Sequence, residues 1–68
     1  MTKVYAQDGD TLLTAINKVK QMMKPDEYCL ALDYNGIEIS IYKDSNPIDL
    51  ITIYNLRYNI QNNIFINN

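Results

Sequence analysis

The clearest pattern of apolar and polar positions lies in the middle of the chain. Residues 28–34 and 37–43 each alternate between apolar and polar side chains, and Asn35-Gly36 stands between them. Asn-Gly favours a two-residue type I′ turn, because both turn residues need a positive φ. The pattern therefore predicts an antiparallel hairpin with one apolar side. On that side the predicted pairs are Tyr34 with Ile37, Leu32 with Ile39, Leu30 with Ile41 and Tyr28 with Lys43. On the other side they are Asp33 with Glu38, Ala31 with Ser40 and Cys29 with Tyr42.

A helical pattern precedes the hairpin. From Thr11 onward apolar residues recur every three or four positions, which is typical of an amphipathic helix. Asp10 is the expected N-cap, and Pro25 is expected to end the helix. Before it, residues 2–7 predict a short strand, which ends in a turn at Asp8-Gly9-Asp10. The apolar residues of the helix are Leu12, Leu13, Ile16, Val19, Met22 and Met23.

The segment after the hairpin supports two interpretations. Ser45 or Asn46 can cap a helix and Pro47 suits a first helical turn, which favours a helix from Ile48 to about Asn59. The alternative is a strand, because the segment is rich in β-branched and aromatic residues and alternates at Thr52, Tyr54, Leu56, Tyr58 and Ile60.

These elements predict a small single α+β domain over residues 1–60, with the order β-α-β-β-α. We expect a three-stranded sheet centred on the Asn-Gly hairpin, with two helices on its apolar face. The first strand is expected to lie parallel to the second and beside the third. Residues 61–68 form either a C-terminal tail or a short added strand, because Ile64-Phe65-Ile66 is an apolar triplet between asparagines.

Composition narrows the classes of function. The 68 residues include no histidine and only Cys29 as a cysteine, which excludes an internal disulfide, a zinc finger and a histidine-dependent triad. The net charge of −2 argues against a dedicated nucleic-acid binder. No apolar run approaches the length of a membrane span, so we expect no membrane association and a cytoplasmic location. Heavy use of Ile, Asn, Lys and Tyr indicates a low-GC genome, such as that of a bacterium or its phage.

Asp33 and Glu38 are the most unusual predicted neighbours. Like charges directly opposite one another in an antiparallel pair are destabilising. Either a cation of a partner compensates them, or water screens them at the exposed mouth of the hairpin. Two carboxylates without a third ligand make a poor metal site, and a flat sheet face offers no enclosing catalytic pocket. We therefore expect no enzyme activity, no metal and no cofactor.

The six tyrosines are a second candidate for binding chemistry, since tyrosine is enriched at protein interfaces. Tyr28, Tyr34 and Tyr54 are expected in or beside the core, whereas Tyr42 and either Tyr5 or Tyr58 are expected on the surface. Ile64-Phe65-Ile66 is expected to pack on its own domain, to form a dimer contact or to reach another partner. The predicted partner-binding residues are Asp33, Glu38, Tyr42, Ser40, Tyr58 and Phe65.

The chain resembles small accessory proteins of bacterial phages and mobile elements in its architecture. The resemblance rests on one helix, the Asn35-Gly36 hairpin with isoleucines on its second strand, and Ser45-Asn46-Pro47 leading into a last helix. It implies a role in binding and blocking or retargeting a host protein in the bacterial cytoplasm, for example a polymerase or a defence nuclease. It transfers no functional residue.

Three hypotheses follow for the function. The first is a protein-binding inhibitor or regulator of a host protein, with the acidic hairpin mouth, Tyr42 and the second helix as its contact surface. The second is a homodimeric nucleic-acid-binding regulator that uses Lys18, Lys20 and Lys24. The third is a structural or self-assembling subunit that docks through its C-terminal segment.

Overall fold

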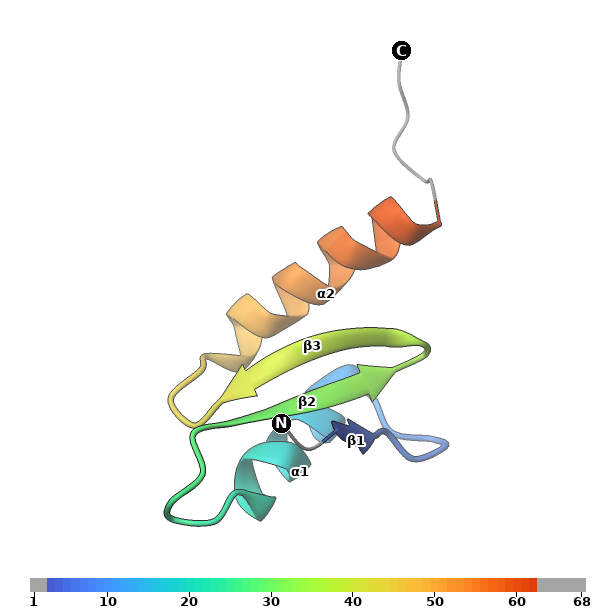
Figure 1. Ribbon diagram of the computed structural model, residues 1–68. Helices are drawn as coiled ribbons and strands as arrows, with labels where there is room; N and C mark the ends of the chain where they lie inside the picture. The colour runs from blue at the N-terminus through green and yellow to red at the C-terminus, as the bar shows by residue number, and fades with distance from the viewer. Residues whose placement is uncertain (1–2, 63–68) are drawn as a thin grey trace.

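Within residues 3–62 the chain forms five elements in the order strand, helix, strand, strand, helix. The computed structural model describes residues 3–62. The three strands make one mixed sheet with the order β1-β2-β3, and both helices pack on the same apolar face (Figure 1). This confirms the predicted α+β class and the order β-α-β-β-α. The elements are β1 (Lys3–Tyr5), α1 (Leu12–Met22), β2 (Cys29–Tyr34), β3 (Ile37–Tyr42) and α2 (Pro47–Gln61).

The hairpin of β2 and β3 has the predicted turn and register. Asn35 and Gly36 both have positive φ, at 54° and 81°. All six pairs predicted between Cys29–Tyr34 and Ile37–Tyr42 are present. Beyond the strand ends, the Lys43 N–H donates to the Tyr28 carbonyl at 3.0 Å. The turn chemistry and the side-chain alternation therefore specify the same register.

The position of β1 differs from the prediction in one respect. It is parallel to β2, as expected, but its neighbour is β2 itself and not β3. The expectation that β1 lies beside the third strand was wrong. One edge of β2 is occupied by β3, and the other edge pairs with β1. The pairing of Val4 with Leu32 sets Val4 on the side of the sheet that faces the core.

The N-caps of the two helices follow sequence chemistry, with one correction. The N-cap of α1 is Thr11, whose Oγ1 accepts from the Thr14 N–H at 3.1 Å. The prediction of Asp10 as the cap was wrong, because the Asp10 carboxylate pairs with Lys18. In α2 the Asn46 Oδ1 accepts from the Ile48 N–H at 2.9 Å. The second segment is a helix, so the strand alternative was wrong.

The core lies between the apolar face of the sheet and the two helices. Tyr54 of α2 meets Tyr34 edge to face, with ring centroids 5.5 Å apart. Tyr28 is 81% exposed, so its predicted place beside the core was wrong: it lies before β2, at the end of the sheet. The buried core residues are Ala15, Ile16, Val19, Leu30, Leu32, Ile37, Ile39, Ile41, Leu50 and Tyr54.

Candidate functional site

The acidic pair of the hairpin has a cation within its own sheet. Asp33 and Glu38 are paired across β2 and β3, as predicted. Lys3 of β1 reaches across β2, and its Nζ lies 2.9 Å from the Glu38 Oε1. The Asp33 Oδ1 accepts from the Gly36 N–H at 3.0 Å, which supports the turn. Both carboxylates thus have a partner within this chain: Lys3 for Glu38, and the Gly36 N–H for Asp33.

The ion pair with Glu38 changes the pKa of Lys3. The hydrogen bond to Glu38 and the charge of Glu38 raise the pKa of the Lys3 ammonium above its usual value of 10.5, with smaller contributions from Tyr5 and Asp33. Lys3 Nζ also lies 5.7 Å from the centroid of the Tyr5 ring. An ion pair between two partly exposed side chains thus links β1 to β3 on the open face of the sheet.

The predicted partner-binding residues lie in different parts of the molecule. Glu38, Ser40 and Tyr42 follow one another on the open side of β3, and all three are exposed. Tyr58 lies on α2, where its ring is 6.1 Å from that of Tyr54. Phe65 lies outside the described residues. The structure therefore brings Asp33 together with the three residues on β3 and places Tyr58 on α2.

The strongest surface feature is the side of α2 that does not face the core. Ile53, Leu56 and Ile60 are 42%, 53% and 62% exposed. Their spacing of three and four residues places them along one side of the helix, and we call them the α2 stripe. Leu50 and Tyr54 occupy the core side. The helix is thus apolar on two sides, and Asp49 and Arg57 are its only charged residues.

The outer edge of β3 runs beside α2. Residues of a hairpin strand point their backbone groups alternately toward the partner strand and away from it. In this register Glu38, Ser40 and Tyr42 direct theirs to the outer edge. The Arg57 Nη1 accordingly donates to the Glu38 carbonyl at 2.7 Å, and the Tyr42 N–H donates to the Ser45 Oγ at 3.0 Å. Within residues 3–62 these contacts occupy both ends of the edge and leave the backbone of Ser40 to solvent.

Two hollows lie along this edge, and we call them together the edge groove. The hollow near the turn is lined by Ile37, Glu38, Arg57, Ile60 and Gln61. The hollow at the other end is lined by Ser40, Tyr42, Asp44, Ser45, Asn46, Asp49, Leu50 and Ile53. The groove therefore combines exposed strand backbone with apolar side chains of the α2 stripe.

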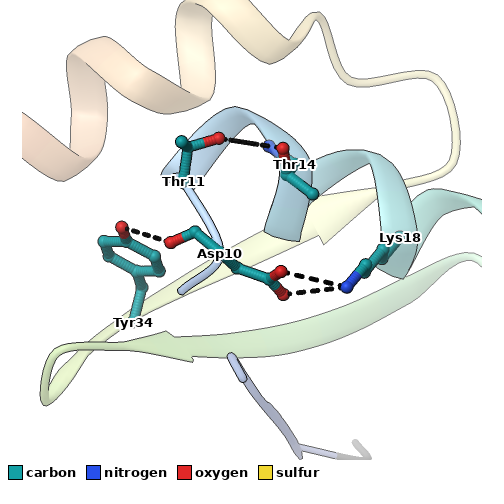
Figure 2. A network of polar contacts seen from close by, with 5 residues as sticks. All are labelled: Asp10, Thr11, Thr14, Lys18 and Tyr34. Atoms are coloured by element: carbon teal, nitrogen blue, oxygen red, sulfur yellow. Dashed lines mark hydrogen bonds and ion pairs between the residues drawn. The ribbon is translucent and has the colours of Figure 1, made fainter. Parts of the chain in front are cut away.

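A third hollow, between β1 and α1, has a different character. Its rim carries Asp10 and Lys18, whose carboxylate and ammonium pair at 3.0 and 3.1 Å (Figure 2). The Tyr34 hydroxyl donates to the Asp10 carbonyl at 2.8 Å, which ties the start of α1 to the hairpin. Thr11 and Thr14 complete the network at the helix N-terminus. These polar groups satisfy one another, so the network has a structural role.

The cations of the described residues are largely engaged in contacts within the molecule. Lys18 pairs with Asp10, and Lys20 donates to the Ser45 carbonyl. Lys43 donates to the carbonyls of Lys24 and Pro25. Of the three lysines considered for phosphate contacts, Lys18 and Lys20 therefore already have partners within the molecule. In residues 3–62 no group of three or more metal-ligating side chains comes together.

Sequence reasoning placed the second helix in the contact surface but did not single out the residues of the α2 stripe or Arg57. The signal was present, since residues 50–60 fitted both a helix and a strand. That ambiguity arises when a helix carries apolar residues on more than one side. Arg57 could not have been assigned, because its contact depends on how α2 lies against β3.

The apolar outer side of α2 thus lies next to the outer edge of β3. Neither α1 nor α2, the helices within residues 3–62, combines the length and the apolar character needed to cross a membrane. No protein-family model matches the sequence, and comparisons with characterised proteins and with solved structures find no match.

Proposed function

We propose that this chain is a small non-enzymatic protein-binding module that contacts its partner through the α2 stripe and the adjoining edge of β3. The observation that carries the proposal is the exposure of Ile53, Leu56 and Ile60 on a helix whose other side already fills the core. Neighbouring exposed apolar side chains on a soluble domain are typical of protein interaction sites. Exposed Tyr42 at the end of the groove adds an aromatic contact of the kind enriched at such sites.

The finer proposal concerns what the binding achieves. We propose that the protein acts as an inhibitor or regulator that binds a host protein in the bacterial cytoplasm, as the resemblance to phage and mobile-element accessory proteins implies. A nucleic-acid partner is less favoured, because phosphate binding needs free cations and the net charge is −2. The apolar stripe instead suits a protein surface with apolar side chains of its own.

A pull-down with a matched pair of variants tests the proposal. Leu56→Glu places a charge in the α2 stripe, and Leu13→Glu places the same charge on an exposed leucine of α1. Tagged wild type and both variants are incubated with a low-GC bacterial lysate, and captured proteins are quantified by mass spectrometry. We expect Leu56→Glu to lower recovery of the partner about tenfold or more, while Leu13→Glu retains it. Equal recovery with all three proteins would contradict the proposal.

A further inference from the structure

We propose that the edge groove takes the C-terminal segment Ile64-Phe65-Ile66 of a second copy of this chain, which adds as a strand to the outer edge of β3. This inference rests on the proposed function and names one partner for it. It starts from three features of the groove: free strand backbone at Ser40, apolar side chains of Ile53 and Ile60, and the closeness of the groove to the end of α2.

The backbone of β3 suits the addition of one short strand. Arg57 occupies the Glu38 carbonyl at one end of the edge, and Ser45 occupies the Tyr42 N–H at the other. The Ser40 N–H and carbonyl lie between them and point away from β2. An added strand of about three residues fits between the two ends, at roughly 3.3 Å per residue. The apolar triplet 64–66 has this length.

The side chains of the triplet suit the two sides of the groove. Successive residues of a strand point to opposite faces of a sheet. Ile64 and Ile66 would share the side that carries the α2 stripe, where Ile53 and Ile60 offer apolar contacts. Phe65 would then point to the open side of the sheet, where Tyr42 is exposed. The order of apolar residues in the triplet thus fits both faces of the extended sheet.

The topology argues for a second copy and against the chain's own segment. Gln61 lies at the turn end of the groove, so a chain that returns along the edge would run parallel to β3. It would make a β-α-β crossover through α2. α1 and α2 cover the same face, but β3 runs opposite to β1 and β2, so this crossover and the β1-α1-β2 crossover would have opposite hands. Crossovers are right-handed in about 98% of cases.

A segment from a second copy is free of this constraint, because no connection within one chain is made. Exchange of identical segments between two copies is a common route to symmetric dimers. In such a dimer each copy donates its residues 64–66 and accepts those of its partner. Ile53 and Ile60, the two residues of the α2 stripe that line the groove, would then be covered by the triplet of the other copy.

The test is sedimentation velocity on the full chain over a range of concentrations, with two variants and their controls. Ser40→Pro removes the outward N–H and leaves the bonds between β2 and β3, whereas Ser40→Ala keeps that N–H. Ile64→Asp with Ile66→Asp alters the triplet and no residue of α1, α2 or the sheet, and Asn67→Asp with Asn68→Asp adds the same charge beyond it. We expect wild type and both controls to dimerise, and both test variants to dimerise about a hundredfold more weakly or not at all.

A mixture of the two test variants sharpens the result. The intact segment of the Ser40→Pro protein can meet the intact edge of the other variant, so the mixture should form a dimer that neither forms alone. A wild type that stays monomeric, or a dimer that survives either test variant in folded form, would overturn the inference. If Ser40→Pro does not fold, the triplet variant and its control decide the result. A monomer that still captures a protein through Leu56 would overturn this inference and leave the proposed function standing.

Discussion

α1 and α2 cover the same face of the sheet and contact each other, but they differ on the side turned to solvent. The outer side of α1 carries Thr14, Asn17, Lys18 and Gln21, all exposed, and its exposed apolar residues, Leu13 and Met22, lie near opposite ends of the helix. The outer side of α2 carries the α2 stripe. The apolar residues of α1 are thus mostly used within the domain, whereas those of α2 exceed what the core needs. α2 thus fills the core with one side, and its other side is the surface that we propose contacts another protein.

The largest expected difference in stability is between a substitution on the core side of α1 and one on the outer side of α2. Ile16 of α1 is 0% exposed, so Ile16→Ala should lower the free energy of unfolding by about 2–5 kcal/mol. Ile53 is partly exposed in the folded state, so Ile53→Ala removes less buried apolar area and should lower the free energy of unfolding by about 1 kcal/mol or less. Urea denaturation followed by circular dichroism measures both. Equal losses would mean that Ile53 belongs to the core and that α2 has no surplus apolar side.

A smaller loss of stability is expected when the N-cap of either helix is removed. Thr11→Ala and Asn46→Ala remove the caps of α1 and α2, and each should cost about 1 kcal/mol of unfolding free energy. Asn17→Ala, on the outer side of α1, serves as the control and should be close to neutral or slightly stabilising. Urea denaturation of the three variants and wild type in the same buffer measures these differences. A neutral Thr11→Ala would contradict the assignment of Thr11 as the cap.

The smallest expected effect on stability comes from the ion pair between Lys3 and Glu38 on the open face of the sheet. The folded pKa of Lys3 is raised above 10.5, so its stabilising contribution is present below pH 10.5 and is lost as the pH rises through the folded pKa. The stability difference between wild type and Lys3→Met should therefore be constant near neutral pH and shrink at alkaline pH. A difference that does not change with pH would show that the ion pair with Glu38 contributes nothing.

The hairpin could be predicted in full because its signals are local and agree with one another. Asn35-Gly36 dictates the turn, and the alternation on either side of it allows one register only. The cap chemistry of Asn46 and Pro47 likewise identified α2 as a helix, although its apolar pattern was ambiguous. Local chemistry of this kind can be read before any tertiary contact is known.

The features that depend on the meeting of distant segments could not be predicted. Lys3 compensates Glu38 only because β1 pairs with β2 in its particular register. Asp10 leaves the capping position to Thr11 because Lys18 and Tyr34 hold its carboxylate and its carbonyl. The exposure of the α2 stripe likewise depends on which side of the helix packs on β3. Sequence reasoning therefore located the acidic pair and Tyr42 but not the groove beside them.

The most direct test of the central claim, that the outer side of α2 is a protein-binding surface, is site-specific photo-crosslinking in bacterial cells. A photoreactive phenylalanine analogue replaces Leu56 in one protein and Leu13 in another, since both leucines are exposed on helices of the same domain. The account predicts a defined crosslinked product from position 56, either with a second copy or with another protein, and none from position 13. Products from position 13 alone, or from neither position, would contradict it.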